Sequence, residues 1–199
     1  MTKEEIRHIL ATRQCQRITD KRLLPAAVLV PLFLQEGDWR VVLTQRSQKV
    51  LHHKGQVSFP GGRRSAPERD LLSTALRESR EEIGLKTEDV EILGQLDDIR
   101  TQTGFVVTPF VGVIPYPYAF KMQRHEIDEI FSAPLSSLVE RDNFQVDYNL
   151  RIASEDSGPG DILGFFYHYQ GKIIWGATAR ILTFFLQLLY PGFSPSLSA

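Results

Sequence analysis

The chain has 199 residues, of which 42% are apolar, and a formal net charge of −1. This length and composition suffice for one domain with a sizeable core, and the near-neutral charge argues against a nucleic-acid partner. The single cysteine, Cys15, excludes an intramolecular disulfide and fits a reducing, cytoplasmic compartment. The N-terminal residues include acidic side chains and lack the apolar core of a signal peptide, so we expect no membrane partner.

The N-terminal segment predicts a short helix that precedes the core. Residues 2–13 are amphipathic, and Thr2 and Glu5 have the spacing of a capping box. Packing onto the domain and a contact in a homodimer are the two alternatives for this helix. We expect a single domain across residues 1–199, with its core between about residues 25 and 190.

The next stretch predicts a hairpin. Residues 26–33 are apolar and indicate a buried strand, although Pro31 favours an edge or a bulge for part of it. A turn at residues 36–38 leads to a second predicted strand at residues 39–45.

A basic segment follows and ends in a Pro-Gly-Gly turn. Its basic side chains are Arg46, Lys49, His52, His53 and Lys54. A phosphate-binding loop and a solvated basic loop are the alternatives for it. Zinc at His52 and His53 is disfavoured, because adjacent residues rarely chelate one metal without further ligands. Gly61 and Gly62 have no side chains, so a substrate can approach their backbone closely.

Residues 70–83 predict a helix with one apolar stripe and one acidic patch. Glu78, Glu81 and Glu82 stand at i, i+3 and i+4, where like charges destabilise a helix by roughly 0.2–0.5 kcal/mol per pair. A hard divalent cation such as Mg²⁺ would offset this repulsion. The alternative is a solvated acidic face on which Arg77 pairs with Glu81.

This glycine turn and helix together resemble the Nudix box, G-x5-E-x7-R-E-U-x-E-E-x-G-U with U an aliphatic residue. The matching residues are Gly62, Glu68, Arg77, Glu78, Glu81, Glu82, Gly84 and Leu85. The chain departs from the pattern at two places. Eight residues separate Glu68 from Arg77, and Ser79 occupies the first aliphatic position.

The segment before the glycines resembles a second motif, that of the coenzyme A pyrophosphatase branch of the same family. Its pattern is L-L-T-x-R-S-x3-R-x3-G-x3-F-P-G-G, and the matching residues are Leu43, Thr44, Arg46, Ser47, Gly55, Phe59, Pro60, Gly61 and Gly62. Val42 replaces the first Leu. Leu51 replaces the second Arg and so lacks a guanidinium that could hold a phosphate. The run from Ile174 to Leu182 is also similar to the C-terminal part of that branch.

Strands are predicted at residues 90–96 and 105–114, with a polar loop at residues 97–105 between them. A wall of the substrate pocket and a solvent-exposed turn are equal alternatives for this loop.

Residues 125–138 predict a strand that enters a short helix after Pro134. The resemblance implies that Glu126 or Glu129 supplies a further metal ligand or, as an alternative to Glu81, the catalytic base. A half-exposed strand with alternating acidic residues is the other interpretation.

The C-terminal part predicts a strand pair at residues 144–152 and 162–169, a short strand at residues 172–175 and a last helix at residues 176–189. The loop between the paired strands, residues 153–161, is a candidate lid. The last helix is too short and too polar for a membrane span, which leaves a core helix and a dimer-packing helix.

The resemblance implies the Nudix α/β/α sandwich, with a mixed sheet flanked by the box helix and the C-terminal helix. It also implies hydrolysis of a diphosphate by Mg²⁺ or Mn²⁺ held on Glu78, Glu81 and Glu82. Arg77 would hold one of these carboxylates in place.

The second motif implies a small-molecule substrate of the coenzyme A type, cleaved to adenosine 3′,5′-bisphosphate and 4′-phosphopantetheine. The residues expected to bind it are Arg46, His53, Lys54, Gly61 and Gly62. Cleavage of ADP-ribose, NADH or a nucleoside triphosphate is the alternative. A non-catalytic nucleotide sensor is expected to lack one of the box glutamates, and none is missing here.

Overall fold

The computed structural model describes residues 1–49, 54–65, 67–147 and 164–194. The elements in chain order are α1 (Lys3–Ala11), β1 (Leu24–Gln35), β2 (Asp38–Arg46), β3 (Val57–Ser58), β4 (Gly61–Arg63), α2 (Leu71–Ile83), η1 (Thr87–Asp89), β5 (Glu91–Gln95), β6 (Ile99–Arg100), β7 (Phe105–Val113), β8 (Ile127–Pro134), α3 (Leu135–Leu138), η2 (Arg141–Asn143), β9 (Phe144–Asp147), β10 (Gly164–Tyr169), β11 (Lys172–Ile174) and α4 (Gly176–Leu189).

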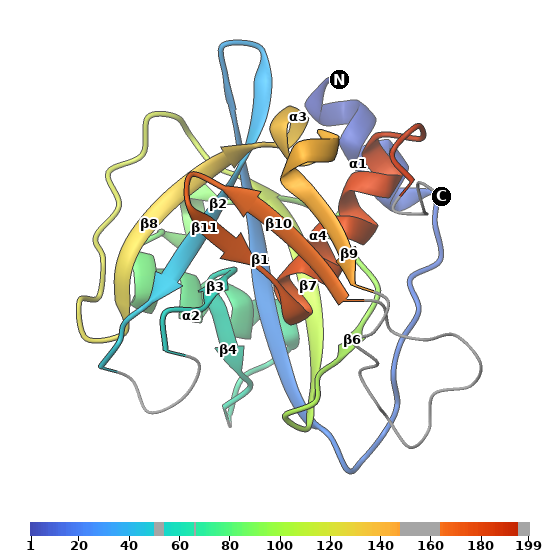
Figure 1. The fold of residues 1–199 in the computed structure, drawn as a ribbon. Coiled ribbons are helices and arrows are strands. Elements are labelled where there is room, and N and C mark those ends of the chain that lie inside the picture. The colour runs from blue at the N-terminus through green and yellow to red at the C-terminus, as the bar shows by residue number, and fades with distance from the viewer. Residues whose placement is uncertain (50–53, 66, 148–163, 195–199) are drawn as a thin grey trace.

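A mixed sheet organises the chain, with β1 at its centre (Figure 1). The main order is β3-β2-β1-β7-β5, and β4, β6 and β8 pair with β1, β7 and β2. β1 runs parallel to β7 along residues 24–32, and it runs antiparallel to β2, with Gln35 opposite Asp38. The predicted hairpin of β1 and β2 is therefore confirmed.

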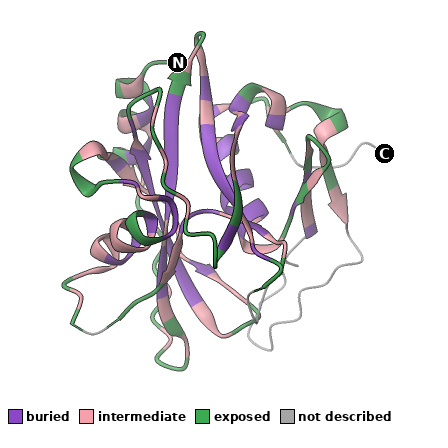
Figure 2. Cartoon of the chain, turned by 90° about the vertical axis from the view of Figure 1, so that its left-hand side faces the viewer, coloured by how far each residue is buried: buried purple, intermediate pink, exposed green. Residues whose placement is uncertain are grey.

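Alternate residues of β1 face the two sides of the sheet, as the period of a strand requires. Val30 and Leu32 belong to the core that contains Ile6 and Leu10 of α1 and the buried side chains of α4. Ala27, Leu29 and Phe33 belong to a second core that contains Ala75 and Ile83 of α2. The strands are largely buried between these helices (Figure 2). This arrangement is the predicted α/β sandwich.

β1 is a central strand and not an edge strand, but Pro31 lies in a stretch of it that is paired on one side only, as the proline indicated. On the antiparallel side of β1, residues 26–28 pair with β4 and residues 32–35 pair with β2. Pro31 falls in the interval between the two ladders, where a strand tolerates a residue without an N–H group.

The helix ends follow the capping signals of the sequence. In α1, the N–H of Glu5 donates to Thr2 Oγ1 (3.2 Å) and the N–H of Thr2 donates to Glu5 Oε2 (2.6 Å), which confirms the capping box. In α2, Asp70 Oδ1 accepts from the N–H of Ser73 (2.8 Å), and Gly84 ends the helix in the left-handed conformation. None of the helices in the described ranges is long and apolar enough to cross a membrane.

Two segments predicted as turn and loop contain short strands instead. The Pro-Gly-Gly turn continues into β4, and the polar loop at residues 97–105 includes β6. β4 pairs with β1, which is remote in the sequence, and β6 is only two residues long, so the local composition showed only the turn residues.

The last strands form a separate three-stranded sheet, in the order β11-β10-β9. Tyr167 of β10 is fully buried, and its hydroxyl shares a hydrogen bond with Thr183 of α4 (2.8 Å). Because α4 also buries Leu182 and Phe185, the structure supports the core-helix alternative, and the homodimer stays a prediction. The candidate lid at residues 153–161 lies outside the described residues.

Candidate active site

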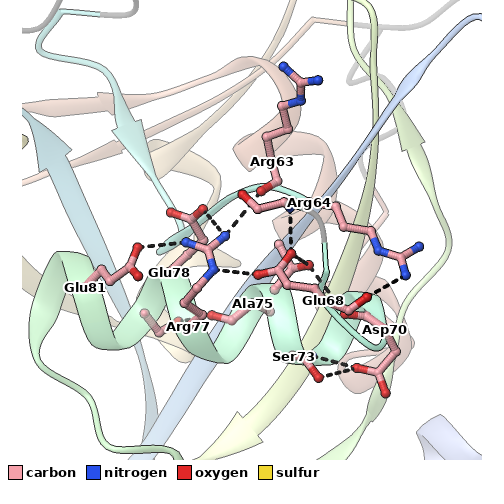
Figure 3. A network of polar contacts seen from close by, with 12 residues as sticks. Arg63, Arg64, Glu68, Asp70, Ser73, Ala75, Arg77, Glu78 and Glu81 are labelled. Carbon is pink, nitrogen blue, oxygen red and sulfur yellow. Dashed lines mark hydrogen bonds and ion pairs between the residues drawn. The ribbon is translucent and has the colours of Figure 1, made fainter.

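Arg77, in the middle of α2, joins three carboxylates (Figure 3). Its Nε donates to Glu68 Oε1 (2.5 Å), its Nη2 to Glu78 Oε1 (2.6 Å) and its Nη1 to Glu81 Oε2 (2.7 Å). Nη2 also donates to the carbonyl oxygen of Arg63 in β4 (3.3 Å). Burial acts to lower the pKa of Arg77, but the hydrogen bonds that Arg77 donates to Glu68 and Glu78 outweigh it and raise the pKa. Arg77 is therefore a fixed cation that ties α2 to β4 and to the loop before the helix.

Glu68 anchors Arg77 from that loop. Its Oε2 accepts from the backbone N–H of Ser65 (2.7 Å) and from Thr74 Oγ1 (2.7 Å). Burial acts to raise the pKa of Glu68, but the hydrogen bonds from Arg77, Thr74 and Ser65 outweigh it and hold the pKa below its usual value. The sequence showed Glu68 only as a motif position, so its anchoring role was missed.

Gly61 and Gly62 let β4 lie directly against the acidic face of α2. A Cβ on Gly62 would stand 2.5 Å from the carboxyl carbon of Glu78. A Cβ on Gly61 would stand 2.4 Å from the carbonyl oxygen of Ala27, and the backbone φ there is +155°. The N–H of Gly61 donates to Glu82 Oε2 (3.2 Å). Because both residues are glycine, the backbone of this turn lies in direct contact with the carboxylates of Glu78 and Glu82.

Glu82 and Glu78 are carboxylates whose charge is incompletely balanced. The Glu82 side chain is 3% exposed, and burial raises its pKa to about 8. Burial also raises the pKa of Glu78, and the negative charge of Glu126 adds to the shift at both residues. Arg46 Nη1 lies 3.6 Å from Glu82 Oε1 and opposes it only in part. Arg46 Nε is buried and has no hydrogen-bond partner among the described residues.

The other predicted acids lie in different surroundings. Glu81 is directed toward Arg77, with 59% of its side chain exposed. Glu126 is exposed just before β8, where its charge reaches Glu78 and Glu82. Glu129 Oε2 instead forms an ion pair with Lys172 Nζ of β11 (3.1 Å). Glu126 therefore acts electrostatically on the acidic site, whereas Glu129 is paired with Lys172.

The acidic site fits a hard cation by its donors and by its charge. Carboxylate oxygens are the ligands that Mg²⁺ and Mn²⁺ prefer. Burial raises the pKa of Glu78 and Glu82, and the nearby cations, Arg77 at Glu78 and Arg46 at Glu82, offset this effect only in part. Within the described part of the chain, no group of three His, Cys, Asp or Glu side chains is already arranged to hold a metal ion. Glu81 would have to leave Arg77 to complete the predicted set of three.

A cavity of about 480 Å³ adjoins the acidic site. Arg46, Gly61 and Gly62 line its near end, beside Glu78 and Glu82. Arg100 and Arg180 line its far end, together with residues from β10 and the start of α4. A volume in this range suits a small-molecule ligand.

Some of the residues predicted to bind the substrate line this cavity and others do not. Residues 101–103, from the polar loop, lie in its wall, which favours the pocket alternative over a free turn. Lys54 is exposed and does not line it. His53 and Leu51 lie outside the described residues. Sequence reasoning did not identify Arg180 as a residue of the cavity wall. The one signal for it was that the run from Ile174 to Leu182 resembles the C-terminal part of the coenzyme A pyrophosphatase branch.

Comparisons with known proteins find relatives of this chain in sequence and in fold. The sequence matches the NUDIX domain over residues 23–149. It is 34% identical over 158 residues to the uncharacterized Nudix hydrolase NudL of Photorhabdus laumondii, covering 79% of this chain and 80% of that protein. It is 36% identical over 157 residues to NudL of Enterobacter sp., with coverage of 79% and 78%. The structure is similar to that of a MutT/nudix family protein from Enterococcus faecalis, with a TM-score of 0.53 and 15% identity over 92% of this chain and 67% of that one.

Proposed function

Because this chain belongs to the Nudix family, we propose that it is a metal-dependent diphosphatase that cleaves coenzyme A or a coenzyme A derivative. The bond cleaved is the internal diphosphate, and the products are adenosine 3′,5′-bisphosphate and 4′-phosphopantetheine or its derivative. ADP-ribose, NADH and nucleoside triphosphates contain the same kind of bond and are the competing substrates.

The observation that carries this proposal is the position of the second motif. Its residues Arg46, Gly61 and Gly62 line the cavity at the end where Glu78 and Glu82 lie. Within the motif, Thr44 Oγ1 donates to the carbonyl oxygen of Ser58 (3.1 Å) and so ties β2 to β3. The motif therefore shapes the part of the cavity that meets a scissile diphosphate.

The acidic site supplies the groups that this hydrolysis needs. Glu78 and Glu82, joined by Glu81, would hold Mg²⁺ or Mn²⁺, which supplies positive charge to the diphosphate oxygens and acidifies a water molecule. Arg77 positions Glu78 by its direct hydrogen bond. The backbone of Gly61 and Gly62 leaves room for the diphosphate beside these carboxylates.

A carboxylate must also accept the proton of the attacking water. Glu126 suits this role better than Glu129, because Glu129 is paired with Lys172. Glu81 is the alternative, since more than half of its side chain is exposed beside the site. Arg46 adds a cation at the near end of the cavity, where the diphosphate carries its charge.

The deciding experiment is a comparison of kcat/KM for coenzyme A, ADP-ribose, NADH and nucleoside triphosphates with Mg²⁺ or Mn²⁺, with the products identified by mass spectrometry. We expect coenzyme A to have the highest value and Glu82→Gln to lose several orders of magnitude of activity. A higher value for ADP-ribose would refute the substrate assignment. Cleavage of none of these compounds would point to a non-catalytic sensor.

A further inference from the structure

The far end of the cavity contains a cation with no acidic partner. Arg180 lies on α4, and its Nη1 donates to the carbonyl oxygen of Arg100 (2.9 Å). No carboxylate forms an ion pair with Arg180 among the residues that the structure describes. A guanidinium has five N–H donors, so most of those of Arg180 are left for a ligand. Burial lowers the pKa of Arg180, which indicates that its charge is poorly solvated where it stands.

The other arginines of the cavity wall differ from Arg180 in this respect. Arg100 Nη2 pairs with Asp20 Oδ2 (2.6 Å), and Arg46 lies near Glu82. Arg63 is exposed, so water solvates its charge. A ligand with a negative group at the far end of the cavity would therefore gain most from contact with Arg180.

Apolar and aromatic side chains line the same cavity as this cation. Phe105 and Val107 of β7, Phe165 of β10 and Ile181 of α4 belong to the same wall. Trp175, at the start of α4, also lines the cavity and is 45% exposed, which is unusual for so large an apolar side chain. Flat apolar faces of this kind favour a planar ring system. The far end thus combines a surface for a base with a cation for an anion.

We propose that the far end of the cavity binds the phosphorylated nucleoside half of the substrate, and that Arg180 is the specificity residue that contacts its 3′-phosphate. The inference rests on the proposed function, since it assigns one half of coenzyme A to this end. The pantetheine half is neutral beyond the diphosphate, so it would leave the charge of Arg180 unpaired. The adenosine 3′-phosphate half supplies both a planar base and an anion.

The test compares coenzyme A with its 3′-dephospho form in the full-length protein. The wild type should favour coenzyme A in kcat/KM by roughly ten- to a hundredfold, the range expected for one charge-assisted hydrogen-bond contact. Arg180→Gln should bring this ratio close to one, and Arg180→Lys should restore part of it. Arg141→Gln, which removes an exposed arginine outside the cavity, should keep the wild-type ratio. An unchanged ratio in Arg180→Gln, with both compounds still cleaved, would overturn the proposal and favour the pantetheine half at this end.

Direct binding separates failure of this inference from failure of the proposed function. If the wild type cleaves neither compound, the proposed function fails, and calorimetry with adenosine 3′,5′-bisphosphate and adenosine 5′-monophosphate tests the subsite alone. The subsite is supported if the wild type binds the bisphosphate more tightly than the monophosphate and Arg180→Gln loses this preference. Equal affinity of the wild type for the two nucleotides overturns it. If Arg180→Gln does not fold, Arg180→Lys takes its place. A several-fold fall of the ratio in that variant supports the contact, and the wild-type ratio overturns it.

Discussion

Replacing Glu82 with Gln should stabilise the protein at neutral pH when no metal is present. Glu82 is buried, and its pKa in the folded protein is raised from 4.5 to about 8. The folded state therefore favours the protonated form, so the full stability is present below pH 4.5 and declines as the pH rises toward 8. Gln is neutral, has nearly the same shape and can still accept the hydrogen bond from the N–H of Gly61. The variant should escape this decline.

The pKa shift sets the size of the effect. Each pH unit between the unfolded and folded pKa values removes about 1.4 kcal/mol from the free energy of unfolding. From pH 4.5 to pH 7 the loss is on the order of 3 kcal/mol. In a chain of this size that corresponds to roughly 5–10 °C in the melting temperature.

Thermal unfolding in excess chelator, at about pH 5 and about pH 7.5, measures the effect. Glu81→Gln is the matched control, because it makes the same chemical change at a side chain that is 59% exposed. Glu82→Gln should melt well above the wild type at the higher pH and close to it at the lower pH, and the control should show no such gain. An equal difference between Glu82→Gln and wild type at both pH values would refute the electrostatic argument.

Three further predictions concern binding and catalysis. Mg²⁺ or Mn²⁺ should raise the melting temperature of the wild type at pH 7.5, because a ligand that binds the folded state stabilises it. The same ion should raise the melting temperature of Glu82→Gln much less. An equal rise in both proteins would show that the cation binds at a site that does not include Glu82. Arg46→Ala should lower kcat/KM for coenzyme A, by a factor that shrinks at high salt, and equal kinetics across salt concentrations would contradict its role at the cavity. Glu126→Gln should lower kcat by about a hundredfold or more, whereas Glu129→Gln, which breaks only the pair with Lys172, should change it little. A larger fall of kcat in Glu129→Gln than in Glu126→Gln would indicate that Glu129, and not Glu126, is the catalytic base.

The box helix was predictable because its signals are local. The helix predicted over residues 70–83 is α2, Leu71–Ile83, with Asp70 as its N-cap, and the spacing of Glu78, Glu81 and Glu82 places them on one face. The pair of Arg77 with Glu81, which the sequence offered as an alternative to a metal site, exists in the structure (2.7 Å). Arg77 also donates hydrogen bonds to Glu68 and Glu78. A helical pattern cannot show the bond to Glu68, because Glu68 precedes the helix.

Features that depend on remote pairing were not predictable. β4 forms because residues 61–63 meet residues 26–28 of β1. The pairing of β6 with the next strand, β7, is local, but a strand of only two residues has no period that the sequence could show. Glu126 and Glu129 were equal candidates, since both are acidic and lie near the start of the same strand. The structure distinguishes them, because Glu129 is paired with Lys172 of β11 whereas the charge of Glu126 acts on Glu78 and Glu82.

The proposed chemistry and the proposed substrate choice depend on separate parts of this chain. The glycines and the carboxylates expected to hold the metal lie within residues 61–82, on β4, α2 and the loop between them, and Arg46 and Glu126 join them from elsewhere in the chain. Arg180 reaches the same cavity from α4 and is held by the carbonyl oxygen of Arg100, 80 residues away in sequence. The Arg77 network and the Arg180 contact share no residue. We therefore expect a substitution at Arg180 to change which diphosphate compound is preferred while the acidic site keeps its structure. For this reason the ratio of kcat/KM for two substrates, rather than the rate with one substrate, tests the far end of the cavity.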